Sequence, residues 1–184
     1  EFSQIHKEKL ILIYARLNVP RNGFDLAVNS LTEWAQTYAP ARSWKVVSAG
    51  DSHEDIPLAN GVALRSLGPL QLGEYASYLA RSWIGLSFMF LPHPSYPRFE
   101  MAEFGAWVVT NKFPGNDLSD LTATILPVSG PPYAKDVADK LSWCCDQFQE
   151  GRTSASGTPP CLFSQTENEF PELRQMLESW LRSG

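Results

Sequence analysis

The sequence predicts an α/β fold in which helices cover both faces of a doubly wound, mainly parallel sheet. Apolar runs of strand length alternate along the chain with segments whose apolar residues recur at helical spacing. Strands that alternate with helices are joined by right-handed crossovers, which make the strands parallel and place helices on both faces. The 184 residues, 43% of them apolar, fit one such domain.

The first half of the chain supplies three strands and one helix. The apolar run KLILIYA at 9–15 lies between a charged segment and a loop, as expected of a strand. It is followed by the helical pattern GFDLAVNSLTEWAQTYA at 23–39. The strand signal returns in SWKVVSAG at 43–50 and in GVALRSLG at 61–68.

The second half continues the alternation. A short helix is expected at 71–82, a strand at 83–91, a helix at 98–104 and a strand at 106–112, and ATILPV at 123–128 is a weaker strand candidate.

The C-terminal part is predicted to contain two more helices. One spans 131–150 and the other, amphipathic, spans 168–183, with Asn168 and Pro171 near its start. Residues 152–167 are small and polar, and we expect a flexible loop there.

Composition excludes several classes of partner. A net charge of −5 argues against a general nucleic-acid or anionic-membrane partner. No apolar run approaches the roughly 18 residues of a membrane span, and no signal sequence opens the chain, so we expect a soluble, cytoplasmic domain. The sequence does not begin with methionine, and we expect it to be a fragment of a longer protein.

Neither the cysteines nor the histidines have the spacing of metal ligands. Cys144 and Cys145 are adjacent and Cys161 stands alone, so reduced thiols that fill a helix face are the simplest interpretation. His6 and His53 have no partners at metal-binding spacing. We therefore expect no metal and no other cofactor.

The loop after the first strand faces the ligand crevice in a sheet of this kind. Its sequence, ARLNVPRNG, contains neither a GxGxxG nor a GxxxxGK motif. Arg16 and Arg21 lie five residues apart around a turn with Pro20 and Gly23, so they can converge on one anion, and the guanidinium fork suits phosphate. Alternatively, both arginines are solvated or neutralise nearby carboxylates.

A second polar loop, PHPSYPRFE at 92–100, leads from a strand into a helix. The first amides of a helix lack internal partners and attract anions. Ser95 can donate a hydroxyl, while Pro94 and Pro97 reduce the freedom of the loop. His93 either contacts a ligand or satisfies a loop carbonyl.

Two segments resemble the C-terminal donor domain of GT-B glycosyltransferases. In KLILIYARLNVPRNGFDLAVNSL the family's strand, Gly-Arg-Leu and Lys-Gly helix start are matched, with Ala15 for the glycine and Arg21 for the lysine. The later segment is LRSLGPLQLGEYASYLARSWIGLSFMFLPHPSYPRFEMAEFGAWVVTNK. It resembles the family's Leu-Gly, short helix, strand, loop and Leu-Glu-Ala-Met-Ala-x-Gly.

A narrower resemblance, to WsaF-type rhamnosyltransferases that build cell-surface glycans, is carried by PRNGF, LGPL, EYA, IGLSFM, PHPSYP and FEMAEFGAWVVTNK. The match covers residues 9–112 well and the remainder loosely. The resemblance implies a Rossmann-like domain, the C-terminal half of a GT-B fold, that binds a nucleotide-diphosphate sugar, with dTDP-L-rhamnose as the expected donor. The glycan acceptor would bind in an N-terminal domain outside this chain, so the fragment alone is expected not to transfer sugar.

The resemblance also implies roles for individual residues. Arg16 and Arg21 would act in catalysis by stabilising the departing nucleoside diphosphate. Glu100 would accept hydrogen bonds from the ribose, although it could instead be a helix N-terminal carboxylate stabilised by the dipole. The nucleobase of the donor would lie against Leu67 and Gly68. The diphosphate would be wrapped by His93, Pro94, Ser95 and Tyr96, although Tyr96 could instead close the core.

The sequence departs from the family at one position and leaves two other functions open. The family's first paired glutamate is replaced by Pro92, so its role at the sugar must be filled differently. A nucleotide-sugar epimerase shares the fold and would form product without an acceptor. A non-catalytic interaction module would not bind nucleotides.

Overall fold

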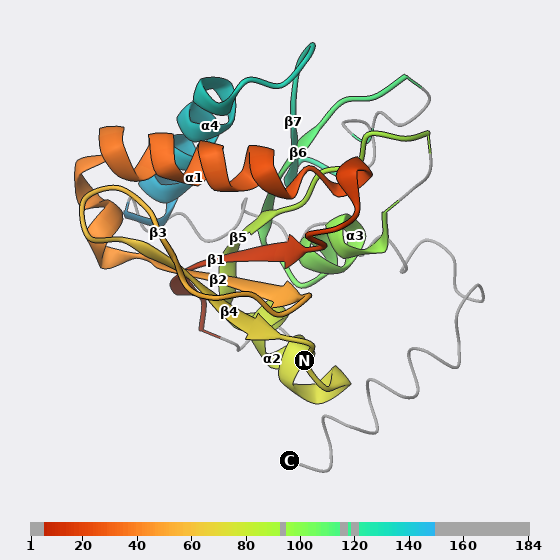
Figure 1. The fold of residues 1–184 in the computed structure, drawn as a ribbon, viewed down its shortest axis with the longest axis horizontal. Coiled ribbons are helices and arrows are strands. Elements are labelled where there is room, and N and C mark those ends of the chain that lie inside the picture. Colours follow the sequence, from red (N-terminus) through yellow and green to blue (C-terminus); the bar gives the residue numbers. More distant parts are fainter. Residues whose placement is uncertain (1–5, 93–94, 115–117, 119–121, 150–184) are drawn as a thin grey trace.

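The computed structural model describes residues 6–92, 95–114, 118 and 122–149. In this part of the chain a seven-stranded sheet is covered by helices (Figure 1). The strands are β1 (Glu8–Ala15), β2 (Lys45–Gly50), β3 (Ile56–Pro57), β4 (Ala63–Gly68), β5 (Ser82–Leu86), β6 (Trp107–Asn111) and β7 (Ile125–Val128). The α-helices are α1 (Phe24–Thr37), α2 (Leu72–Arg81), α3 (Tyr96–Glu103) and α4 (Ala134–Gln149), and η2 (Pro20–Asn22) and η3 (Ala39–Ser43) are 3-10 helices.

The strand order is β3-β4-β2-β1-β5-β6-β7, and every neighbouring pair is parallel except β3 with β4. Without β3 this is the order of a doubly wound nucleotide-binding sheet, which grows outward from its first strand in both directions. The predicted α/β class is therefore confirmed. β3 was not predicted because two residues are too short to show periodicity, and Pro57 suits its position at the edge of the sheet.

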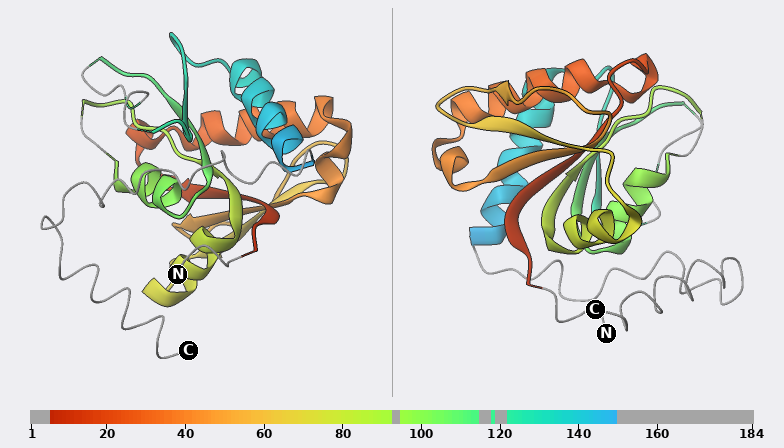
Figure 2. Two further views of the ribbon diagram at one scale, coloured as in Figure 1. Left: turned by 180° about the vertical axis from the view of Figure 1, so that it is seen from behind. Right: turned by 60° about the horizontal axis from the view of Figure 1, so that its bottom comes forward.

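The sheet separates two hydrophobic cores. Ile11 and Ile13 of β1 face α1 and α4, whereas Leu10 and Leu12 face α2 and α3. Figure 2 shows α1 and α4 on one face of the sheet and α2 and α3 on the other. Burial of both faces explains why β1 is a continuous apolar run and does not alternate with polar residues.

The observed boundaries differ from the expected ones by a few residues. The strand expected at 83–91 keeps regular pairing only from Ser82 to Leu86. The helix expected from Arg98 begins at Tyr96, and the helix expected at 131–150 begins at Ala134. The loop expected at 152–167, the helix at 168–183 and Cys161 lie outside the described residues.

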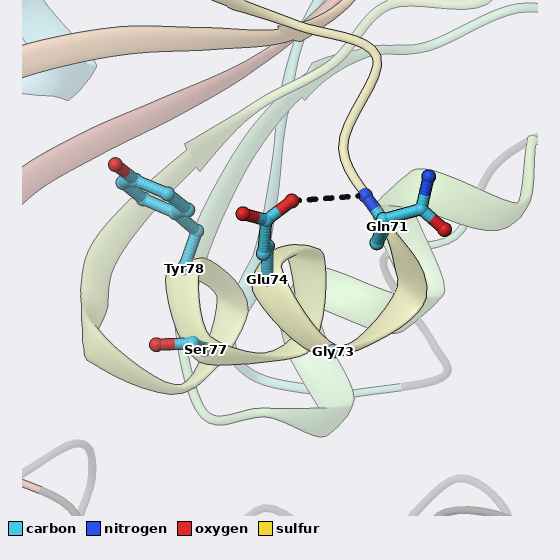
Figure 3. A pocket seen from close by; sticks show the side chains of 5 residues that line it. All are labelled: Gln71, Gly73, Glu74, Ser77 and Tyr78. Carbon is cyan, nitrogen blue, oxygen red and sulfur yellow. Dashed lines mark hydrogen bonds between the residues drawn. The ribbon is translucent and has the colours of Figure 1, made fainter.

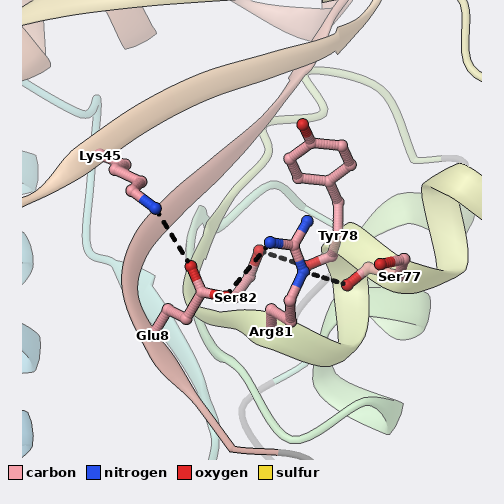
Figure 4. Close-up of polar contacts among 6 residues, drawn as sticks. All are labelled: Glu8, Lys45, Ser77, Tyr78, Arg81 and Ser82. Carbon is pink, nitrogen blue, oxygen red and sulfur yellow. Dashed lines mark hydrogen bonds and ion pairs between the residues drawn. The ribbon is translucent and has the colours of Figure 1, made fainter.

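Polar contacts at the amino ends of the strands tie β1 to its neighbours (Figure 4). The Glu8 carboxylate lies 3.5 Å from Lys45 of β2 and 3.2 Å from Arg81 of α2. The Arg81 guanidinium also covers the Tyr78 ring at 4.8 Å. Side-chain contacts therefore connect the elements at the amino edge of the sheet, and this edge is opposite the carboxyl ends where ligands bind in such folds.

Two further sequence predictions concern the cysteines and membrane spans. Cys144 and Cys145 are free and buried on α4, and burial raises the pKa of both thiols, so both behave as packing residues. Among the helices that the structure describes, none is long and apolar enough to cross a membrane.

Candidate functional site

The loops that follow β1 and β5 meet at the carboxyl edge of the sheet, where the strand order reverses direction. The amide of Phe90 donates to the carbonyl of Arg21 at 2.8 Å and so joins the two loops. Gly23 has a φ of 59°, and a Cβ there would lie 2.6 Å from the Phe90 ring. A glycine is therefore required for this loop contact, and the predicted arginine loop lies directly at the switch point.

Arg16 is held by two neighbours. Its Nη1 donates to the Tyr14 hydroxyl at 3.3 Å, and its Nε lies 3.6 Å from Asp51. The Tyr14 contact and then the Asp51 charge raise the pKa of Arg16. Asp51 also accepts from the amide of Leu17 at 3.0 Å, which fixes the start of the loop. The contact with Asp51 agrees with the alternative interpretation of Arg16, in which the arginine neutralises a nearby carboxylate. The Arg16 side chain is nevertheless 42% exposed.

Arg21 has different surroundings, although it belongs to the same loop. It lies in η2 and its side chain is exposed. Among the described residues, no hydrogen-bond or ion-pair partner contacts its guanidinium. The structure thus places both arginines on the loop after β1, at the carboxyl edge of the sheet, but among the described residues no contact brings the two guanidinium groups together.

The start of α3 offers fewer free amides than a standard helix. Pro97 has no amide proton, and the amide of Arg98 donates to the Ser95 carbonyl at 3.3 Å. Ser95 precedes the helix, is buried and makes no side-chain cap. Tyr96 is 69% exposed, so it does not close the core. His93 and Pro94 lie outside the described residues.

Glu100 lies farther inside α3 than the sequence suggested. The helix begins at Tyr96 and has no acidic residue in its first turn, which argues against a role in capping the helix dipole. The Glu100 Oε2 accepts a hydrogen bond from the Tyr75 hydroxyl at 2.9 Å. Burial raises the pKa of Glu100, and the Tyr75 bond lowers it in part.

Leu67 and Gly68 end β4 at the same edge of the sheet. Gly68 has a φ of 66°, and a Cβ there would lie 2.7 Å from the Ser52 Oγ. The loop that carries Ser52 is fastened to β4, because Ser66 accepts from the amide of His53 at 3.1 Å. The glycine therefore serves the turn itself, and half-buried Leu67 packs into the core beneath α2 and α3.

Sequence reasoning missed two residues near the site. Tyr75 lies in the EYA motif of the family resemblance, but the sequence assigned no role to it, and its contact with Glu100 is what reveals one. Arg98 is fully buried and donates to Thr110 of β6 at 3.4 Å, and burial lowers its pKa to about 10. Spacing alone did not distinguish this arginine from an ordinary surface residue of a short helix.

His53 has a structural environment. Its Nδ1 lies 2.7 Å from the Glu54 carbonyl, which can only accept, so Nε2 accepts from the Ser48 hydroxyl at 2.6 Å. Within the described ranges, no group of three His, Cys, Asp or Glu side chains is arranged to hold a metal ion.

A separate hollow of about 590 Å³ lies along α2 (Figure 3). It is lined by Gln71, Gly73, Glu74, Ser77 and Tyr78, and Glu74 accepts from the amide of Gln71 at 3.2 Å. None of the residues predicted to bind a ligand lines this hollow.

Comparison with known proteins assigns the family. The family of WsaF C-terminal domains matches residues 9–142. The chain belongs to this family. One relative of this WsaF-type domain is the O-antigen biosynthesis protein RfbC of Myxococcus xanthus, which is 35% identical over 108 residues. The match spans 58% of this chain and 8% of that protein.

Solved structures show the same fold at low sequence identity. Anabaena HepE in complex with UDP and glucose has a TM-score of 0.62 at 16% identity, covering 97% of this chain and 49% of that one. WaaG, a glycosyltransferase involved in lipopolysaccharide biosynthesis, has a TM-score of 0.65 at 12% identity, covering 95% and 47%. UDP-GlcNAc 2-epimerase from Neisseria meningitidis, bound to UDP-GlcNAc, has a TM-score of 0.55 at 12% identity, covering 100% and 46%.

The WsaF-type domain thus spans about half the length of each of these three structures. Its Rossmann-like sheet is one half of a GT-B fold, as the sequence predicted.

Proposed function

We propose that this chain is the donor-binding domain of a glycosyltransferase that uses a nucleoside-diphosphate sugar. The observation that carries the proposal is the position of three charged residues in a WsaF-type domain: Arg16, Arg21 and Glu100 all lie on segments at the carboxyl edge beside the switch point. Cations suit a diphosphate, and a half-buried carboxylate suits hydroxyl donors.

In this proposal Arg16, Arg21 and the start of α3 stabilise the charge that grows on the departing nucleoside diphosphate. Such stabilisation accelerates transfer because the charge is larger in the transition state than in the bound donor. Two guanidinium groups supply positive charge at the diphosphate, so we expect binding without a divalent ion. His93, Pro94, Ser95 and Tyr96 surround the diphosphate, Glu100 binds the ribose, and the base lies beside Leu67 and Gly68.

The resemblance to WsaF-type rhamnosyltransferases supports dTDP-L-rhamnose as the donor, and the O-antigen protein RfbC among the relatives supports a cell-surface glycan as the acceptor. In this proposal the acceptor binds to an N-terminal domain, and the present chain alone binds donor without transferring sugar.

A calorimetric titration of the chain with dTDP, UDP, GDP and thymidine, in buffer with a metal chelator, tests this function. We expect dTDP to bind more tightly than thymidine, because only the diphosphate engages the arginines. Arg21→Ala should weaken dTDP binding by roughly ten- to a hundredfold, as for loss of a charge-assisted hydrogen bond. Arg42→Ala is the matched control, because Arg42 lies in η3 at the opposite edge of the sheet. Equal affinity for dTDP and thymidine would contradict the diphosphate role.

A nucleotide-sugar epimerase is the second candidate, because UDP-GlcNAc 2-epimerase shares the fold. The two functions differ in their requirement for an acceptor. Conversion of a nucleotide sugar to its epimer by the full-length protein, with no acceptor present, would favour the epimerase.

A further inference from the structure

We propose that Tyr75 is a positioning residue that holds one oxygen of the Glu100 carboxylate so that the other oxygen faces the ribose of the bound nucleotide. This inference rests on the proposed donor-binding function. It adds a residue of α2 to a site otherwise built from the loops after β1 and β5, the end of β4 and α3.

The geometry fixes one half of the carboxylate. The Tyr75 hydroxyl donates to Glu100 Oε2 at 2.9 Å, and a phenol has a single proton to donate. In the part of the chain that the structure describes, Oε1 has no hydrogen-bond partner. One oxygen is therefore oriented by the protein, while the other keeps its full capacity to accept from hydroxyl groups.

The pair differs from an ordinary core contact. The Tyr75 ring packs against the core beneath α2 and α3, and its hydroxyl meets the half-buried Glu100 carboxylate. Burial of a carboxylate costs free energy unless its oxygens are paired. A half-buried carboxylate with only one paired oxygen is expected where a ligand completes the pairing.

Tyr75 remains a donor at physiological pH. Burial raises its pKa, and the charge of Glu100 raises it further, followed by a smaller effect of Tyr14. Tyr14 in turn accepts from Arg16 at 3.3 Å. Tyr75 bonds to Glu100 on the proposed ribose side and Tyr14 bonds to Arg16 on the proposed phosphate side. Its raised pKa keeps Tyr75 uncharged, so it does not repel the diphosphate.

The titratable and charged groups around Glu100 come from three elements. Tyr75 on α2 bonds to Glu100 directly, Tyr14 of β1 contributes to the Tyr75 pKa and accepts from Arg16, and on α3 itself Arg98 contacts Thr110. Of these groups, Tyr75 is the one that lowers the Glu100 pKa against the effect of burial. Removal of the Tyr75 hydroxyl should therefore raise the Glu100 pKa, and the carboxylate should accept ribose hydroxyls only at higher pH.

The test compares Tyr75→Phe with Tyr78→Phe. Both tyrosines belong to α2, but the Tyr78 hydroxyl has no hydrogen-bond partner among the described residues. The affinity for dTDP is measured by calorimetry across acidic to neutral pH, and folding is checked by circular dichroism. We expect Tyr75→Phe to weaken binding about three- to tenfold and to move the acidic fall in affinity to higher pH. Tyr78→Phe should retain the wild-type profile.

The outcomes separate the inference from the function on which it rests. If the wild type binds dTDP and Tyr75→Phe retains both affinity and pH profile, Tyr75 does not position Glu100 and the proposed function stands. Loss of stability without a shift of the pH profile assigns Tyr75 to packing and also overturns the inference. If the wild type binds none of dTDP, UDP and GDP, the proposed function fails and the positioning role fails with it. If it binds only UDP or GDP, the comparison of the two variants is made with that nucleotide. In a Glu100→Gln background, Tyr75→Phe should no longer move the pH profile.

Discussion

At the scale of single residues, the proposed site contains charged groups that suit a ligand but that the folded protein disfavours or already pairs. Glu100 is penalised by burial in its charged form, yet the charged form is the better acceptor for ribose hydroxyls. Arg16 is partly neutralised by Asp51, so a diphosphate would compete with that carboxylate for the guanidinium. Such opposition between stability and function is common at binding sites.

Glu100→Gln is expected to weaken dTDP binding while the free energy of unfolding at neutral pH does not fall. The carbonyl oxygen of the glutamine can still accept from Tyr75. Its NH2 group then lies where the second carboxylate oxygen would accept from the ribose hydroxyls, and two donors cannot pair with each other. Because burial raises the folded-state pKa above 4.5, the wild-type carboxyl group contributes stability below 4.5 that is lost as pH rises through the raised pKa. Glutamine does not titrate, so the free energy of unfolding of Glu100→Gln does not fall in this way as the pH rises.

Calorimetry with dTDP and urea unfolding at acidic and neutral pH measure both effects, and Glu33→Gln on α1 is the control. Full affinity with reduced stability would contradict the ribose assignment.

At the scale of elements, the sequence was sufficient where a periodic pattern decides the structure. β1 and α1 were predicted within one or two residues because apolar periodicity and burial coincide there. Long-range contacts were not predictable: the proximity of α3 to β5 depends on Gly85, where a Cβ would lie 2.5 Å from the Met101 sulfur. The Tyr75 contact with Glu100 was missed for the same reason, because it joins residues 25 positions apart.

Lys7 illustrates a long-range contact between elements. Its ammonium group donates to the carbonyls of Leu79 and Ser82 at the end of α2 and of Phe104 at the end of α3. Three donors thus meet three acceptors at the carboxyl ends of two helices, where positive charge is favourable. Burial nevertheless lowers the pKa of Lys7 from 10.5 to about 8.

Lys7→Met should therefore remove a pH dependence of stability. Between pH 8 and 10.5 the unfolded chain retains a proton on Lys7 that the folded chain has released, so the wild-type free energy of unfolding rises with pH. The slope is at most about 1.4 kcal/mol per pH unit, and the variant should lack this contribution. Urea unfolding across this range measures the difference between the two proteins.

Lys45→Met is the control, because it removes an exposed lysine at the same edge, and it should retain the wild-type slope. Equal slopes for Lys7→Met and the wild type would contradict the lowered pKa of Lys7.

At the scale of the whole molecule, the strand order places every candidate binding segment at one edge of the sheet. The loop after β1, the end of β4 and the start of α3 lie at the carboxyl ends of parallel strands, whereas the ion pairs of Glu8 lie at the amino ends. The topology therefore predicts that ligand binding protects backbone amides at the carboxyl edge of the sheet and leaves those at the amino edge unchanged. The hollow along α2 is the competing location.

Hydrogen exchange of the backbone amides with and without dTDP should distinguish the two locations. Binding at the switch point should slow exchange in residues 16–23 and 95–99, because the loop after β1 and the first turn of α3 would then be covered or ordered by the diphosphate. Residues 38–44 and 104–106 precede β2 and β6 at the amino edge, and their exchange should not change. The inactive control ligand is thymidine, which lacks the diphosphate and should protect these loops less. Protection confined to 71–78 would instead place the nucleotide in the hollow on α2, and the arginine loop would then lose its assigned role.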